Sequence, residues 1–79
     1  MTAELVLYVR EGCHLCEQFL LDLSLDFPAA LERLRTRDVD SDASLATAYG
    51  LRVPVLAMGA AVVCEGVYDP AKGGSALGL

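Results

Sequence analysis

Two cysteines separated by two residues are the part of this sequence best suited to chemistry. Cys13 and Cys16 lie between a short apolar run, residues 5–9, and a longer amphipathic run, residues 16–27. A Cys-x-x-Cys pair placed where a strand passes into a helix can cycle between a dithiol and a disulfide. The first hypothesis is therefore thiol–disulfide exchange, with the rest of the chain holding the pair in place.

The two sulfurs are expected to differ in reactivity. Cys16 begins a helical stripe, continued at positions 19, 20, 23 and 27, that faces the core, whereas Cys13 lies at the start of the helix and faces outward. The first amides of a helix lack partners and the macrodipole is positive there, so we expect the pKa of Cys13 to fall below the ~8.5 of free cysteine. Cys13 is thus the predicted nucleophile, and Cys16 is predicted to resolve the mixed disulfide. Leu21 and Leu25 lie off this stripe, so it does not explain why these two positions are apolar.

Composition and charge limit the functions open to the chain. Its 79 residues suffice for one domain, 1–79, and a 54% hydrophobic content without tryptophan predicts a globular fold with an aliphatic core. The net charge of −5 disfavours nucleic acid and anionic membranes as partners. No apolar run approaches the ~20 residues of a spanning helix and no leader pattern is visible, so we expect a cytoplasmic location. Thiols are kept reduced there, and a cysteine pair is more often catalytic or metal-binding than structural.

The hydrophobic pattern predicts an α/β domain in the order strand, helix, strand, helix, strand, strand, helix, with a four-stranded mixed sheet. The first two strands are expected to be parallel, with a right-handed crossover, and the final two to form an antiparallel hairpin with a type II′ turn at Gly59-Ala60. The second strand is rich in charge, which suits a sheet edge. The expected strands are residues 5–9, 34–39, 51–58 and 61–64. The first expected helix covers residues 13–27, with a further helical turn at 29–34, and the second is capped by residues 40–42 and ends at Gly50. A last helix is expected from Asp69-Pro70, and Gly73, Gly74 and Gly78 weaken it.

This order of elements resembles the thioredoxin fold, and in size and detail the chain is similar to the glutaredoxins. The run from Tyr8 to Cys16 resembles the glutaredoxin run of Tyr, Ser, Lys, two residues and Cys-Pro-Tyr-Cys, with Arg10 where those proteins carry a basic residue. Val53-Pro54 is similar to their Val-Pro segment, which implies a cis bond before Pro54 and a substrate groove beside it. More narrowly, Cys-His-Leu-Cys with Asp-Val-Asp-Ser-Asp and Tyr-Gly-Leu-Arg-Val-Pro-Val-Leu resembles a family of small bacterial glutaredoxin-like proteins.

The resemblance implies a thiol–disulfide oxidoreductase that reduces protein or glutathione mixed disulfides, with no bound cofactor and glutathione as a co-substrate. We expect a monomer whose partner is a disulfide-containing protein or glutathione. Glutaredoxins that bind glutathione carry Gly-Gly and an acidic pair after the last strand, whereas residues 64–69 here are Cys-Glu-Gly-Val-Tyr-Asp, and Glu65 adds negative charge near an anionic tripeptide. The substrate-binding residues that the resemblance implies are Arg10, His14, Val53, Pro54, Gly66 and Asp69.

Other functions remain open from the sequence. The main alternative is a non-catalytic binding module that docks an extended partner beside Val53-Pro54. The cysteine pair could also have lost turnover or bind zinc, but a zinc site would require a different fold. The resemblance to glutaredoxins adds single-cysteine chemistry, with an iron–sulfur cluster that bridges two chains. Cys64 is expected to be a buried strand residue, and His14 is either an exposed side chain or a group that tunes Cys13. If the chain bound zinc in such a different fold, the ligands would be Cys13, His14, Cys16 and Cys64.

Overall fold

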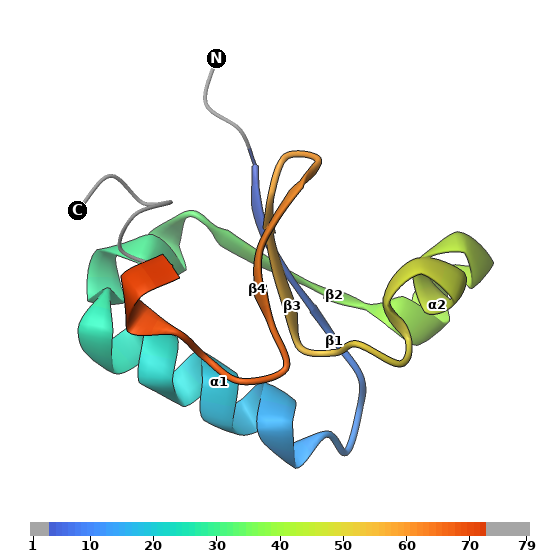
Figure 1. Cartoon of the computed structure of the whole chain (residues 1–79), viewed down its shortest axis with the longest axis horizontal. Coiled ribbons are helices and arrows are strands. Elements are labelled where there is room, and N and C mark those ends of the chain that lie inside the picture. The colour runs from blue at the N-terminus through green and yellow to red at the C-terminus, as the bar shows by residue number, and fades with distance from the viewer. Residues whose placement is uncertain (1–3, 73–79) are drawn as a thin grey trace.

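The computed structural model describes residues 4–72, which form a four-stranded sheet between two layers of helix (Figure 1). The strands lie in the order β2-β1-β3-β4. Helix α1 and the last helical turn lie on one side of the sheet and α2 lies on the other. This confirms the predicted α/β class and mixed sheet. The elements are β1 (Leu5–Val9), α1 (His14–Asp26), the 3-10 helix η1 (Pro28–Glu32), β2 (Leu34–Asp38), the 3-10 helix η2 (Val39–Ser41), α2 (Ala43–Tyr49), β3 (Val55–Met58) and β4 (Ala61–Glu65).

Strand β1 is the centre of the sheet. It pairs in parallel with β2, from Leu5 opposite Leu34 onward, and antiparallel with β3, where Tyr8 lies opposite Val55. β3 continues antiparallel to β4, with a register shift after Leu56. The charged strand β2 is an edge, as its composition predicted, because its exposed charges discourage pairing with another chain.

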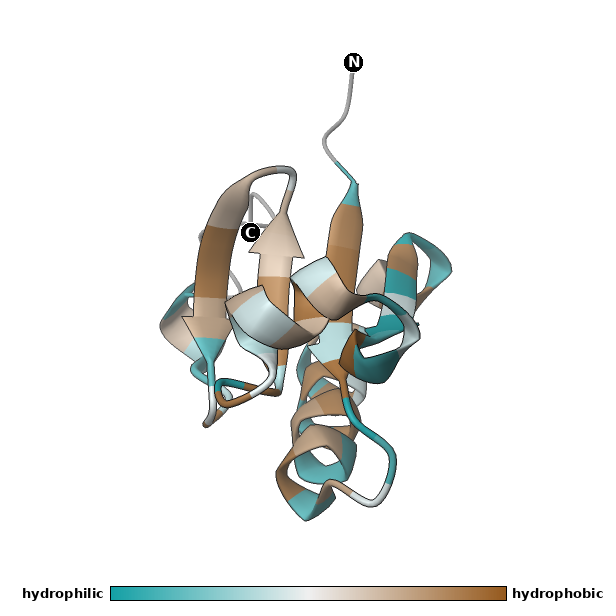
Figure 2. Cartoon of the chain, turned by 90° about the vertical axis from the view of Figure 1, so that its right-hand side faces the viewer, coloured by the Kyte–Doolittle hydropathy of each residue, from teal (hydrophilic) through white to brown (hydrophobic). Residues whose placement is uncertain are grey.

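The main core lies between α1 and the sheet. Alternate β1 residues, Leu5 and Leu7, face α1, and the helix buries Phe19 and Leu23 against them. Figure 2 shows much of β1, β3 and β4 in the brown and tan of hydrophobic residues, whereas α2, in front of the sheet, is pale. The two leucines that the helical stripe left unexplained lie on the solvent side of α1. The exposed fractions of Leu21 and Leu25 are 52% and 71%.

The start of β3 corrects the prediction of a strand over residues 51–58. Leu51 is fully exposed, and the Arg52 N–H donates to the Tyr49 carbonyl (2.8 Å), so the chain turns here before it enters the sheet. Pro54 lacks an N–H and directly precedes the ladder, which begins at Val55. The prediction was wrong here because it relied on residue type alone, and the apolar residues of this turn resemble those of a strand.

Two other strand ends differ by one residue. β2 ends at Asp38 because its carboxylate accepts the Asp40 N–H and begins η2, so Val39 is helical and fully buried. β4 extends to Glu65, one residue beyond the prediction. In the turn between β3 and β4, Gly59 has a φ of 60°, and Ala60, like every other described non-glycine residue, has a negative φ. A positive φ at the first central residue and a negative one at the second are what a type II′ turn requires.

The predicted helix caps are present. The Asp42 carboxylate accepts hydrogen bonds from the Ser44 hydroxyl and the Ser44 N–H at the start of α2, and these two bonds lower the pKa of Asp42. The Asp69 carboxylate accepts the N–H of Ala71 (3.0 Å), which starts the last helix at Pro70. The glycines that were expected to weaken this helix lie outside the described residues.

Candidate functional site

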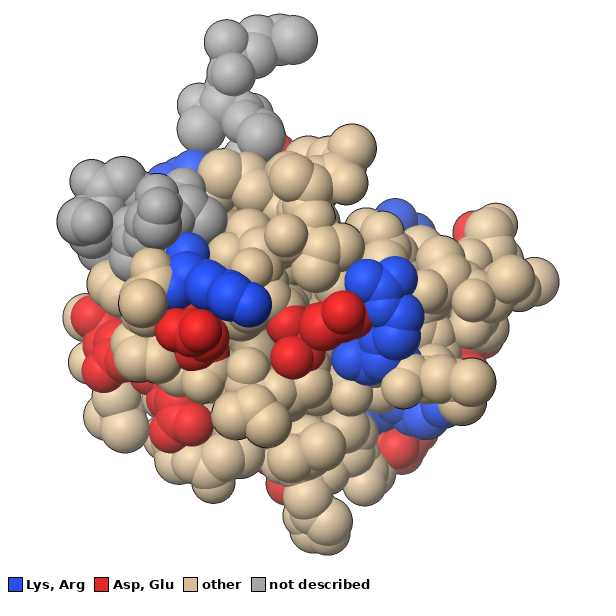
Figure 3. Space-filling view, in the orientation of Figure 1, with Lys and Arg blue, Asp and Glu red and all other residues tan. Residues whose placement is uncertain are grey.

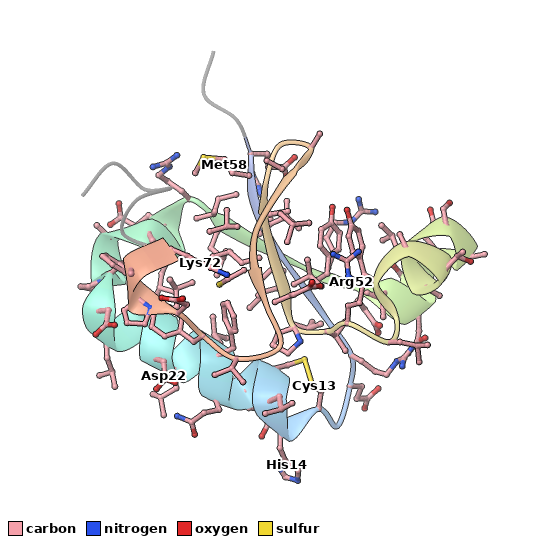
Figure 4. The ribbon with its side chains drawn as sticks, in the orientation of Figure 1. Cys13, His14, Asp22, Arg52, Met58 and Lys72 are labelled. Carbon is pink, nitrogen blue, oxygen red and sulfur yellow. A yellow bond between two sulfur atoms is a disulfide. The ribbon has the colours of Figure 1, made fainter. Side chains whose placement is uncertain are left out.

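Cys13 and Cys16 form a disulfide at the N-terminal end of α1 (Figure 4). The tight turn before Cys13 uses Gly12 at a φ of 77°, and the Cys13 N–H donates to the Arg10 carbonyl (3.2 Å). Cys13 is the N-cap of α1, and its Sγ accepts the backbone N–H of Cys16 at 3.1 Å. Cys13 is half-buried and Cys16 is only 5% exposed, which confirms the predicted difference in exposure. Their roles as nucleophile and resolving residue stay predictions.

The peptide bond between Val53 and Pro54 is cis, as the resemblance implied. Pro54 is buried and Val53 is half-buried, and the Pro54 carbonyl accepts the N–H of Gly66 at 2.8 Å. Because Tyr8 pairs with Val55, the Val53-Pro54 segment lies at the end of the sheet where β1 leads toward Cys13. Three of the predicted substrate-binding residues, Val53, Pro54 and Gly66, therefore lie at the same end of the sheet as the dithiol.

Arg10 is engaged by other residues. Its guanidinium makes two hydrogen bonds to the Asp40 carboxylate (3.0 and 3.1 Å) and one to the Gly50 carbonyl (3.0 Å). Gly50 is buried, and a Cβ there would lie 2.4 Å from the Ala46 carbonyl oxygen and 3.1 Å from the guanidinium. Arg10 thus ties the loop before Cys13 to the end of α2, and its charge is matched by Asp40.

The other two predicted substrate-binding residues are placed differently. His14 is almost completely exposed, and its Nδ1 lies 3.6 Å from the Glu17 carboxylate, one turn along α1. It points away from the sheet in Figure 4. The Asp69 carboxylate accepts the amides of the last helical turn. The first expectation for His14, an exposed first-turn side chain, is confirmed.

A pocket of about 350 Å³ opens beside the disulfide. It lies between α1, the loop before it and the first two strands, on the β2 side of the dithiol. This pocket could not be predicted from the sequence, because Thr36 of β2 lies far along the chain from the other lining residues. Its lining comprises residues 10–13, Val9, Cys16, Glu17, Leu20 and Thr36.

A family model described as Glutaredoxin-like domain (DUF836) matches residues 4–72. The chain belongs to the glutaredoxin-like family. Two solved structures are similar to this glutaredoxin-like protein along nearly their whole length. The target protein XcR50 from X. campestris has 35% identity and a TM-score of 0.76, with 94% of this chain and 95% of that one covered. Protein Ne2328 from Nitrosomonas europaea has 30% identity and a TM-score of 0.73, with 99% and 89% covered. Among curated proteins, none matches the chain.

The glutaredoxin-like protein also contains an aromatic cluster that sequence reasoning missed. Tyr8 and Tyr49 stack with ring centroids 4.4 Å apart, and the Arg52 guanidinium lies 5.6 Å from the Tyr49 centroid. Arg52 also pairs with the Glu65 carboxylate, which raises the pKa of Arg52. The cluster packs α2 onto the face of the sheet opposite α1. Strand alternation could have indicated this face for Tyr8, since Leu7 faces the core.

Cys64, the third cysteine, is 4% exposed in the core beneath α1, as predicted for a strand residue. Burial raises the pKa of its thiol. Within residues 4–72, no three His, Cys, Asp or Glu side chains are grouped so that they could hold a metal ion. None of the helices in that part of the glutaredoxin-like protein is long and apolar enough to cross a membrane.

Proposed function

We propose that this protein is a thiol–disulfide oxidoreductase that reduces protein or glutathione mixed disulfides through Cys13 and Cys16. One observation supports the proposal: Cys13 is half-buried and its Sγ accepts a helix N-terminal amide, while Cys16 lies buried within bonding reach. The amide and the helix terminus favour negative charge on the outer sulfur. The inner sulfur is shielded from other reagents but can reach its neighbour.

The proposed reaction has two exchange steps, starting from the reduced dithiol. The Cys13 thiolate attacks one sulfur of the substrate disulfide, forms a mixed disulfide and releases the other sulfur as a thiolate, which takes up a proton. The thiol of Cys16 loses its proton and attacks the Sγ of Cys13, which releases the second substrate thiolate. The substrate gains two electrons, and the protein ends as the Cys13–Cys16 disulfide. Glutathione or a reductase would then supply two electrons to reduce the Cys13–Cys16 disulfide again. We place this cycle in the cytoplasm.

Single-cysteine variants test this function. The reduction of 2-hydroxyethyl disulfide, coupled through glutathione and glutathione reductase to NADPH oxidation, should fall to the background rate in Cys13→Ser. Cys64→Ser is the matched control, because it also removes one thiol but lies in the core, and it should keep the wild-type rate once its folding is verified by circular dichroism. Activity in Cys16→Ser would show that glutathione can resolve the mixed disulfide. Equal rates for wild type and Cys13→Ser would overturn the proposed function.

A further inference from the structure

The pocket beside the dithiol is continuous with the reacting sulfurs, since Cys13 and Cys16 are part of its wall. Val9 and Leu20 give it an apolar lining, and both are only partly buried by the core. Its volume of about 350 Å³ is near the lower limit of the roughly 300–1,000 Å³ typical of ligand sites. Such a space suits a side chain next to a substrate disulfide.

The charge at the pocket is negative. Glu11 and Glu17 both line it and both are exposed. The only cation among its lining residues is Arg10, whose guanidinium is held by Asp40. In Figure 3 the lower edge of the molecule, where Figure 4 places Cys13 and His14, shows no lysine or arginine. An anionic group would therefore meet two carboxylates here without a free cation to bind it.

We propose that this pocket selects polypeptide disulfides with an apolar residue and a lysine or arginine next to the reacting cysteine. The inference rests on the proposed function and names its substrate class. The apolar side chain would pack on Val9 and Leu20, and the cation would lie between the carboxylates of Glu11 and Glu17. Anionic disulfides, including glutathione disulfide, are disfavoured by the same two carboxylates.

Three peptide disulfides of different charge provide the test. The symmetric disulfide of acetyl-Leu-Cys-Lys-Ala-amide is compared with the versions that carry Gln or Glu in place of Lys. Each rate constant for reduction by the reduced protein is divided by the rate constant of the same peptide with dithiothreitol, whose only charge is that of its attacking thiolate, so the intrinsic reactivity of the peptide and its attraction to a thiolate cancel. Because exposed ion pairs contribute about 0.2–1 kcal/mol each, the normalised rate should be about tenfold higher for Lys than for Glu, with Gln between them.

Two double variants identify the carboxylates responsible. Glu11→Gln with Glu17→Gln should reduce the preference for Lys over Glu to less than about twofold, since both pocket charges are gone. The matched control is Glu4→Gln with Glu32→Gln, which removes the same charge at exposed positions outside the pocket. This control variant should keep the wild-type preference for the Lys peptide over the Glu peptide. Comparing peptides within one variant also cancels any change in the thiolate fraction of Cys13.

The outcomes separate this inference from the proposed function. Normalised rates that are equal for the three peptides, or highest for Glu, would overturn the inference while the function stands. A preference for Lys that survives in Glu11→Gln with Glu17→Gln would also overturn it. If the protein reduces none of the three peptides and also fails with 2-hydroxyethyl disulfide, the proposed function falls, and this inference falls with it.

Discussion

The hydrogen bond from the Cys16 amide to the Cys13 sulfur predicts an unusually acidic thiol at position 13. In the reduced protein this N–H, 3.1 Å from Sγ in the disulfide form, would donate to the thiolate. The backbone N–H stays in place when Cys16 becomes serine. The variant with Cys16→Ser and Cys64→Ser therefore isolates Cys13 as the sole thiol and keeps the donor that acts on it.

The size of the effect follows from the position of the sulfur. A negative charge at a helix N-terminus is stabilised by about 0.3–1 kcal/mol, and by up to about 2 kcal/mol where it is partly buried. Cys13 is the N-cap and is half-buried, so we take about 1 kcal/mol. Since 1.36 kcal/mol corresponds to about tenfold, the ionisation constant should increase about fivefold. The carboxylates of Glu11 and Glu17 act in the opposite direction.

The assay follows alkylation by iodoacetamide as a function of pH, with mass spectrometry as the readout. The midpoint is the relevant quantity, because the intrinsic nucleophilicity of a thiolate falls as its pKa falls. The folded variant should have a midpoint below the ~8.5 of free cysteine, and the same variant unfolded in guanidinium chloride should return to that value. Adding Glu17→Gln should lower the folded midpoint further, because a repelling charge is removed.

A folded midpoint at or above the unfolded one would refute this reasoning. Cys13 would then gain nothing from its place on the helix, and the proposed nucleophile would lose its activation. Stability provides an independent check. A folded-state pKa below the unfolded one adds stability above the unfolded pKa that is lost as the pH falls through the folded one. The reduced variant should therefore gain stability as the pH rises through the folded pKa of Cys13 toward ~8.5, where the gain levels off, and its Cys13→Ser derivative should lack this gain.

Other regions of the molecule yield further predictions. Phe19→Ala should lower the free energy of unfolding by about 3–5 kcal/mol in urea titrations, whereas Leu21→Ala, at an exposed position, should change it by less than about 0.5 kcal/mol. Burial and the hydrogen bond to Asp26 raise the pKa of Tyr68, so stability should decline as the pH rises above ~10, and Tyr68→Phe should weaken this decline. Cys64 should be alkylated by iodoacetamide only at the rate of unfolding, and rapid labelling in native buffer would contradict its burial.

Features that depend on local pattern could be predicted from the sequence. The helical spacing of Cys16, Phe19 and Leu23 identified the buried face of α1, and all three are buried. The charges of residues 34–39 identified an edge strand. The cis bond before Pro54 required the family resemblance, because only about 5–6% of X–Pro bonds in folded proteins are cis.

Features that depend on contacts between distant segments could not be predicted. Arg10 could have remained free in its loop, and nothing in the spacing singles out Asp40, thirty residues later, among eleven acidic side chains. The stacking of Tyr8 on Tyr49 likewise requires α2 to lie on a known face of the sheet. The strand predicted over residues 51–58 began too early because Leu51 is apolar by type and yet fully exposed.

The pairing of Arg10 with Asp40 determines how this site can work. With that guanidinium engaged, we expect a Cys13 thiolate to be stabilised by the backbone of α1, through a short-range hydrogen bond that salt screens little. The proposed choice of substrate depends instead on Glu11 and Glu17, whose exposed carboxylates act through solvent and are screened strongly. Thiolate activation and substrate selection thus depend on different groups within the same site. Salt should therefore weaken selection for a cationic peptide far more than it shifts the ionisation of Cys13.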